Sequence, residues 1–237
     1  MLENLDLGNV MALDIETVPQ YRNYQELPEH WKKLWDKKSA LKYPTKLPHE
    51  SYNSAGIYAE FGKVICVSLG LFSRWGKSYQ LKIKSYFGED EKKLLNAVSD
   101  ALDKFVKSPI QLLLAHNGKE FDFPYLSRRM VINQVKLPIV LDTAGKKPWE
   151  LNHLDTMELW KFGDFKAYTS LELLAATFDI PTPKDDIDGS MVCDIYYNDG
   201  DLQRIKTYCE KDVATLARLM VKFKGEGDIP ESVISIV

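Results

Sequence analysis

The feature that most constrains the fold of this chain is the alternation of short apolar runs with longer stretches of helical periodicity. The apolar runs have the length and composition of buried strands, and we expect strands at residues 10–15, 64–72, 79–87 and 111–117. The stretches between and after them repeat apolar residues at helical spacing, and we expect helices at residues 89–106, 121–130, 170–178 and 201–223. Ser170 is typical of a helix N-cap. This order predicts an α/β protein with a mixed sheet and helical cover.

One segment, from about residue 19 to residue 60, interrupts this pattern. It has scattered prolines, many tyrosines and an excess of lysine, with a single short helix expected near Trp31 and Trp35. We interpret it as a largely irregular surface insertion within a single domain that spans residues 1–237. The two tryptophans are four residues apart, which favours one packed helix face over contact with a ligand.

Composition excludes several classes of protein. No run approaches the roughly 18 apolar residues of a membrane span, and the amino-terminal residues lack the features of a signal peptide. The three cysteines, Cys66, Cys193 and Cys209, are far apart in sequence and predict buried free thiols in a reducing compartment, with the cytoplasm as the expected location. The net charge of −3 gives no sign of a nucleic-acid partner, although an enzyme that binds phosphates through cations does not need a basic surface.

Two carboxylates, Asp14 and Glu16, end the first expected strand. Residues i and i+2 of a strand point to the same face, so these acids project together while Ile15 enters the core. Their repulsion would force one of them to keep its proton unless a divalent cation neutralises both. Taken alone, the same pattern also describes a solvated strand end.

A third acid, Asp122, follows the strand expected at residues 111–117, in the run Asn117-Gly-Lys-Glu-Phe121-Asp122. This position is a strand–helix junction at the carboxyl edge of the sheet, where open α/β sheets bind ligands. The alternative is that Asp122 only caps the helix that follows it.

Tyr208 and Asp212 are four residues apart in the last expected helix. Residues at this spacing share one helix face, so the hydroxyl and the carboxylate reach the same place. The alternative puts Tyr208 in the core and leaves Asp212 as an exposed helix charge.

The three elements occur in the order DxE, NxxxFD and YxxxD, and together they resemble motifs I, II and III of the DEDD (DnaQ-like) superfamily of 3′-5′ exonucleases. A tyrosine four residues before the last aspartate marks the DEDDy branch, whereas the histidine branch has His where this chain has Thr207. Over residues 9–223, apart from the insertion, the chain is similar to the exonuclease domain of family B DNA polymerases and its stand-alone relatives. The resemblance implies an RNase H-like fold, with a mixed five-stranded sheet, one antiparallel strand near its edge and helices on both faces.

The resemblance also implies the composition of the site. Two divalent ions, Mg²⁺ or Mn²⁺, would be held by four acids, namely Asp14, Glu16, Asp122 and Asp212. Asp14 would bridge the ions, Glu16 and Asp212 would complete the site for the attacking water, and Asp122 would serve the second ion. A phenol with a pKa near 10 is a poor base, so Tyr208 would orient this water. The expected substrate-binding residues are Thr17, Asn117 and Phe121, whereas Asp155 and His116 are more typical of structural roles.

The implied activity is metal-dependent hydrolysis from the 3′ end of single-stranded DNA, with release of nucleoside 5′-monophosphates. An exoribonuclease acting on RNA or short oligoribonucleotides is the alternative, because contacts between cations and phosphate do not read the sugar. An inactive RNase H-like module that binds nucleic acid is the alternative from another class, although a degraded site should have lost at least one acid. We expect nucleic acid with a free 3′ end as the partner, DNA before RNA, together with a separate polymerase or repair protein and no membrane.

Overall fold

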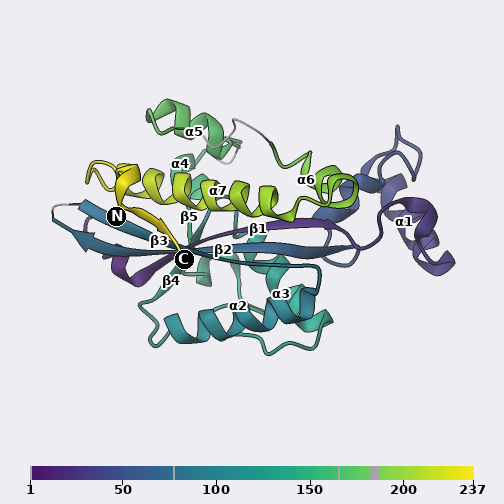
Figure 1. Ribbon diagram of the computed structural model, residues 1–237, viewed down its shortest axis with the longest axis horizontal. Coiled ribbons are helices and arrows are strands. Elements are labelled where there is room, and N and C mark those ends of the chain that lie inside the picture. Colours follow the sequence, from purple (N-terminus) through teal and green to yellow (C-terminus); the bar gives the residue numbers. More distant parts are fainter. Residues whose placement is uncertain (1, 77, 165, 182–186) are drawn as a thin grey trace.

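One mixed β-sheet organises the protein, and the computed structural model describes residues 2–76, 78–164, 166–181 and 187–237 (Figure 1). Within these residues the sheet has six strands in the order β5-β4-β1-β2-β3-β6. The strands are β1 (Val10–Pro19), β2 (Gly62–Trp75), β3 (Ser78–Phe87), β4 (Leu112–Ala115), β5 (Leu154–Asp155) and β6 (Ile234–Ile236). Strand β2 runs antiparallel to β1 and β3, and the other pairings are parallel. The predicted mixed sheet is confirmed, and β6 adds a sixth strand to the five expected.

Helices cover both faces of this sheet, with α2 and α3 on one side and α4, α5 and α7 on the other (Figure 1). The α-helices are α1 (Glu29–Lys42), α2 (Glu91–Phe105), α3 (Asp122–Ile132), α4 (Thr156–Lys161), α5 (Leu171–Thr177), α6 (Val192–Asp194) and α7 (Leu202–Phe223). Short helical turns are η1 (Leu7–Asn9), η2 (Tyr24–Glu26), η3 (Tyr52–Ile57), η4 (Pro148–Glu150), η5 (Ile195–Asp199) and η6 (Glu231–Val233). The four predicted helices are confirmed to within two residues. None of the described helices is both long and apolar enough to cross a membrane.

Side chains at the ends of the predicted helices explain why those predictions succeed. The carboxylates of Asp90 and Asp201 accept backbone N–H bonds in the first turns of α2 and α7. The Ser170 hydroxyl accepts the N–H of Leu173 at the start of α5. Each cap satisfies a backbone donor that has no partner within its own helix, so the start of the helix is encoded locally.

Strand β1 is buried on both faces because helices lie on either side of it. Met11, Leu13 and Ile15 pack in the core beneath α2 and α3. Val10 and Ala12 belong to the core between the sheet and α7. The strand alternates with a period of two, so the next members of the second set are Asp14 and Glu16. Strand geometry therefore directs both acids toward the α7 side.

The insertion after β1 is more ordered than the sequence predicts. It contains the 14-residue helix α1 and a hydrophobic cluster of its own, in which Trp35 and Tyr52 are almost fully buried. Trp31 packs edge-on against Phe61 with ring centroids 5.5 Å apart, so the predicted packed tryptophan face is confirmed. The prediction of a largely irregular segment is wrong because its aromatic residues have no sequence period and meet only in three dimensions.

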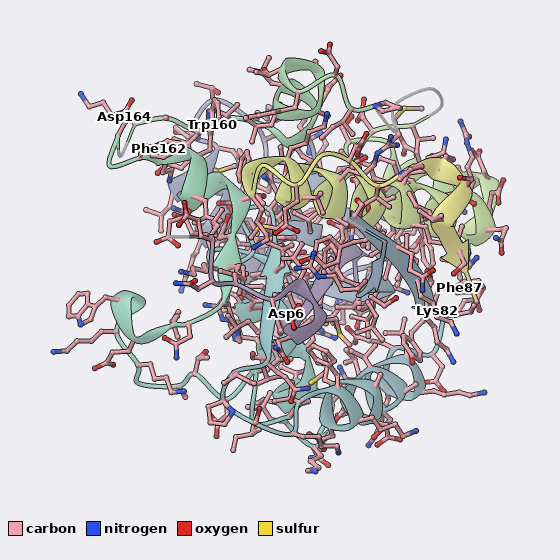
Figure 2. The ribbon with its side chains drawn as sticks, turned by 90° about the vertical axis from the view of Figure 1, so that its left-hand side faces the viewer. Asp6, Lys82, Phe87, Trp160, Phe162 and Asp164 are labelled. Carbon is pink, nitrogen blue, oxygen red and sulfur yellow. The ribbon has the colours of Figure 1, made fainter. Side chains whose placement is uncertain are left out.

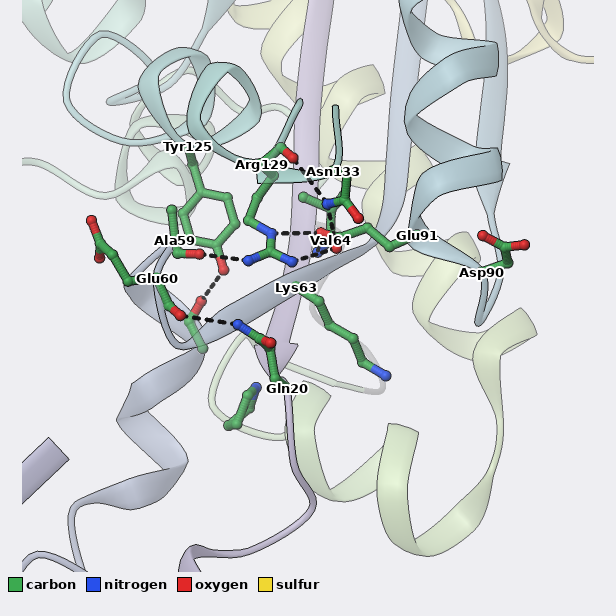
Figure 3. A network of polar contacts seen from close by, with 12 residues as sticks. Gln20, Ala59, Glu60, Lys63, Val64, Asp90, Glu91, Tyr125, Arg129 and Asn133 are labelled. Atoms are coloured by element: carbon green, nitrogen blue, oxygen red, sulfur yellow. Dashed lines mark hydrogen bonds and ion pairs between the residues drawn. The ribbon is translucent and has the colours of Figure 1, made fainter. Parts of the chain in front are cut away.

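A buried ion pair attaches α3 to its surroundings (Figure 3). The Glu91 carboxylate accepts hydrogen bonds from Arg129 Nε at 2.8 Å and from the backbone N–H of Val64 at 2.7 Å. Arg129 Nη1 donates to the Ala59 carbonyl at 2.7 Å. The pair therefore links α2, α3, β2 and the end of the insertion. Because α3 starts at Asp122, this network also fixes the position of that acid.

Candidate active site

The first two acids of the site come from β1, at the point where its pairing with β2 becomes irregular. The register of the two strands shifts between Glu16 and Thr17. Glu16 is buried and Asp14 is half-buried. The side-chain ligand atoms of Asp14, Glu16 and Cys209 all lie within 4.8 Å of one another. The Cys209 thiol also donates to Asp14 Oδ2 at 3.2 Å, so α7 is packed directly against the acids of β1.

Helix α7 supplies Tyr208 and Asp212 to the same place. Their spacing of one helical turn places both side chains on the same helix face, where the charge of Asp212 acts on the Tyr208 hydroxyl. Burial raises the pKa of Tyr208 far above its ordinary value, and the nearby charges of Asp212, Glu16 and Asp14 raise it further. The hydroxyl therefore keeps its proton and acts as a hydrogen-bond donor rather than as a base.

The fourth acid, Asp122, is the first residue of α3 and is only 4% exposed. Burial is the main cause that raises the pKa of Asp122 to about 7, and the charges of Asp155 and Asp212 act in the same direction. The backbone N–H groups of Asp122 and Ile15 act in the opposite direction and partly offset this rise. The contribution of Ile15 shows that the Asp122 carboxylate lies near the β1 segment between Asp14 and Glu16.

Burial and mutual repulsion act on the β1 acids in the same way. Desolvation is the largest cause that raises the pKa of Asp14, followed by the charges of Glu16, Asp212 and Asp122. The pKa of Glu16 is raised first by burial and then by Asp212. A group of four carboxylates in so little water is stable only when it holds protons or when cations neutralise it. Hard divalent cations such as Mg²⁺ prefer oxygen ligands of this kind, so the donor set fits them.

Asp155 holds the loop that carries Asn117. Its buried carboxylate accepts the backbone N–H of Asn117 at 2.9 Å and that of Lys119 at 3.1 Å. Asn117 itself adopts a left-handed backbone conformation with φ of 61°. His116 is held between the Thr156 hydroxyl and the Thr169 carbonyl. These contacts agree with the structural roles expected for Asp155 and His116.

The predicted substrate-binding residues fall into two groups. Thr17 lies close enough to the Tyr125 hydroxyl to lower its pKa, and the ring of Phe121 lies 5.3 Å from that of Tyr125. Thr17 and Phe121 are therefore brought together around one tyrosine. Asn117 instead borders a cavity of about 490 Å³, which Lys119 and Lys161 also line.

An exposed aromatic side chain stands next to this cavity. Phe162 follows Lys161 at the end of α4 and is 89% exposed (Figure 2). Its backbone has a φ of 43°, in the left-handed region that non-glycine residues seldom adopt. Lys161 Nζ lies 4.2 Å from the ring centroid of Tyr168, which is also exposed.

Sequence reasoning missed two residues of the site, Cys66 and Cys209. Both are free and buried, as predicted, whereas the free Cys193 is only partly buried, and Cys66 lies close enough to Cys209 to raise the pKa of its thiol. Cys66 lies opposite Glu16 in the β1–β2 ladder, and Cys209 lies against Asp14. The sequence signal for Cys209 is that it directly follows Tyr208 in the last helix. For Cys66 the strand register is needed, and the sequence does not provide it.

Comparison with known families decides the membership of the chain. A family model described as "Predicted 3'-5' exonuclease related to the exonuclease domain of PolB" matches residues 57–225, well over half of the chain. The chain belongs to this family of PolB-related exonucleases. The matched span contains Asp122, Tyr208 and Asp212, whereas Asp14 and Glu16 precede it.

The PolB-related fold is also found among solved structures. The family B DNA polymerase from the hyperthermophilic archaeon Pyrobaculum calidifontis is similar with a TM-score of 0.53 and 14% identity. The similarity covers 90% of this chain and 24% of that polymerase, so the chain spans about a quarter of its length. At this identity the likeness concerns the fold, and it confirms the predicted RNase H-like α/β architecture. No curated protein matches the chain.

Proposed function

We propose that this PolB-related exonuclease removes nucleotides from the 3′ end of single-stranded DNA in a reaction that requires divalent cations. The observation that carries the proposal is the approach of four acids from β1, α3 and α7, in which the charge of Asp212 helps to raise the pKa values of Asp14, Glu16 and Asp122. Such a group lowers the stability of a protein unless it binds something cationic. Perturbed carboxylates gathered in this way are typical of functional sites.

Asp14, Glu16, Asp122 and Asp212 are the proposed ligands for two ions, Mg²⁺ or Mn²⁺. Asp14 is the proposed ligand shared by both ions, with Glu16 and Asp212 serving one and Asp122 the other. When bound, the cations would supply charge neutralisation at the scissile phosphate and would lower the pKa of the attacking water. The acids contribute by holding that positive charge in a site where little water screens it.

Tyr208 is the proposed positioning group for the attacking water. The raised pKa of its hydroxyl favours the protonated form, which can donate a hydrogen bond to a water molecule. Thr17 and Phe121 are proposed to hold the terminal nucleotide, where an aromatic ring can contact a base. Asn117 is proposed to contact the strand beside the cavity that it borders. The product would be a nucleoside 5′-monophosphate.

The test is cleavage of a 5′-labelled single-stranded oligonucleotide by the purified protein with Mg²⁺, with Mn²⁺ and with EDTA. We expect a ladder that shortens from the 3′ end and disappears in EDTA. Asp14→Ala should abolish the ladder, whereas the matched control Asp100→Asn, an exposed acid on α2, should cut like wild type. An Asp14→Ala protein that cuts as fast as wild type would show that the activity is a contaminant and would refute the proposal.

The same assay separates the remaining roles. Tyr208→Phe should lower kcat more than it raises KM, because the hydroxyl acts on the attacking water and not on substrate affinity. Parallel assays on DNA and RNA strands of the same sequence test the proposed substrate against the oligoribonucleotide alternative. Only a pocket for the 2′-OH would make the protein prefer RNA, because contacts between cations and phosphate do not read the sugar. Faster cutting of RNA would correct the substrate while leaving the reaction unchanged.

A further inference from the structure

The insertion presents a concentration of positive charge on an otherwise acidic chain. Residues 29–46 contain six lysines and two acidic residues, an excess of four positive charges, whereas the whole chain has a formal net charge of −3. We infer that this basic helix surface, made by α1 and the turn after it, binds the phosphates of a single-stranded nucleic acid upstream of its 3′ end. The inference rests on the proposed function and adds a second binding surface to it.

The lysines of this segment have two different environments. Lys32 and Lys38 lie over the rings of Tyr24 and Tyr58, at 5.9 and 4.2 Å from the centroids, and help to hold α1 in place. The others project from the surface and form, within the described part of the chain, no ion pair with an acid. These exposed residues are Lys33, Lys37, Lys42 and Lys46, and they define the basic helix surface.

Local structure accounts for only one of these exposed lysines, because Glu29 lies one helical turn before Lys33, at a spacing that favours attraction. Lys33 and Lys37 are separated by one helical turn, as are Lys38 and Lys42. Like charges at this spacing weaken a helix. Helix α1 therefore carries charges that reduce its own stability, and a polyanion bound along it would remove that repulsion.

The helix is nevertheless firmly attached, so the charges have fixed positions. Trp35 is fully buried, and its ring N–H donates to the Pro48 carbonyl at 2.8 Å. The Ser39 and Ser51 hydroxyls form a buried hydrogen bond of 2.7 Å. Trp35 and Ser39 are the buried residues of α1, and the remainder of the helix, which includes the exposed Lys33, Lys37 and Lys42, is partly buried or faces solvent. Lys33 and Lys37 share the side of α1 opposite the buried Trp35, and a firmly attached helix with exposed cations on that side is suited to contact a phosphate backbone.

The insertion is joined to the segments that carry the site. It begins where β1 ends, three residues after Glu16, and Figure 1 shows α1 at that end of the strand. The Tyr197 hydroxyl donates to the Pro19 carbonyl at 2.6 Å, and Arg22 donates to Asn198 at 2.8 Å. These bonds connect the insertion to the turn that precedes α7. The insertion that carries the basic helix surface is therefore joined both to the end of β1 and to the turn that leads into α7, the two segments that supply three of the four acids.

The experiment compares two triple variants with three exposed lysines neutralised in each. Lys33→Gln, Lys37→Gln and Lys42→Gln remove the charge of α1, and the matched control Lys92→Gln, Lys93→Gln and Lys104→Gln removes the same charge from α2. Binding of a labelled 15-nucleotide single strand is measured by anisotropy in EDTA at several salt concentrations. Cleavage with Mg²⁺ is measured on the 15-mer and on a 4-mer.

We expect the α1 variant to bind the 15-mer about 10- to 100-fold more weakly near 0.1 M salt, with a salt slope smaller by about 2. This follows from a slope of about 0.7 for each phosphate contact to a single strand. Its kcat/KM should fall on the 15-mer and stay close to wild type on the 4-mer. The α2 variant should bind and cut within about twofold of wild type, because a few exposed charges far from the strand contribute little.

Two outcomes would overturn the inference. Unchanged binding by the α1 variant would mean that the surface serves another partner, such as an acidic protein. Equal losses in both triple variants would mean that only overall charge matters. If wild type cuts neither strand in Mg²⁺, the proposed function fails, yet the comparison in EDTA still decides whether α1 binds nucleic acid.

Discussion

Replacing Asp14 by Asn should stabilise the cation-free protein and at the same time remove its response to Mg²⁺. Asp14 is close to the other acids of the site, and its pKa is raised by burial first and by their charges second. Asparagine keeps the shape and an acceptor oxygen for the Cys209 thiol but carries no charge. The substitution therefore removes repulsion without creating a cavity.

The size of the effect follows from the geometry. The ligand oxygens of Asp14 and Glu16 lie within 4.8 Å of each other. At an effective dielectric constant of about 20, two charges at this separation repel by about 3.5 kcal/mol. Part of this repulsion is relieved when a carboxyl keeps its proton, so we expect a gain of about 1–3 kcal/mol at pH 8. For a chain of this size, each kcal/mol raises the Tm by about 2–4 °C.

The gain should depend on pH with a definite sign. The folded protein raises the pKa of these carboxyls, for Asp122 to about 7, so it binds more protons than the unfolded chain between about pH 4 and pH 7. The free energy of unfolding of the cation-free protein therefore falls as the pH rises through this window. In the Asp14→Asn variant this decrease in the free energy of unfolding should be smaller. The variant and wild type should therefore have nearly equal stability at pH 5 and differ most at pH 8.

Thermal unfolding followed by circular dichroism measures both effects, in EDTA and in Mg²⁺ at each pH. A cation at 100 times its Kd stabilises wild type by about 2.7 kcal/mol, and the variant should gain far less. A variant that is less stable than wild type in EDTA at pH 8 would refute the electrostatic argument. An equal Mg²⁺ response in both proteins would refute the assignment of Asp14 as a ligand.

Three further substitutions test other parts of the structure. Glu91→Gln leaves Arg129 buried without its counter-charge, so it should lower the free energy of unfolding, measured in urea, by about 3–5 kcal/mol. Adding Arg129→Met to this variant should restore part of the lost stability. A double variant whose loss equals the sum of the two single losses would contradict the pairing. Asp155→Asn loses an acceptor for the backbone N–H groups of the Asn117 loop and should cost about 1–3 kcal/mol of stability. Its kcat/KM for cleavage should fall about tenfold if the loop contacts substrate, and an unchanged value would separate the loop from the site. Phe162→Gly relieves a left-handed backbone that glycine adopts freely, so its Tm should rise by an amount equivalent to about 1 kcal/mol; a fall in Tm would show that the exposed ring is held by packing.

Local chemistry explains why much of this protein follows from its sequence. Helices α2, α5 and α7 have Asp90, Ser170 and Asp201 as their N-caps, and each cap acts on the first turn of its own helix. The period of two along β1 determines that Asp14 and Glu16 share a face, and the helical period determines that Tyr208 and Asp212 do. These relations join residues at most four positions apart, which a linear pattern can express.

Tertiary structure alone decided what surrounds those residues. The contact between Cys209 and Asp14 joins residues 195 positions apart, and Asp122 of α3 lies close enough to Asp14 of β1 for its charge to raise the pKa of that acid. The raised pKa values depend on water being excluded by helices on both faces of the sheet, which no single segment encodes. The order of the insertion likewise depends on aromatic side chains that are scattered in sequence and converge on Trp35. Short-range periodicity sets which side chains point together, whereas burial and charge density arise only when distant segments pack.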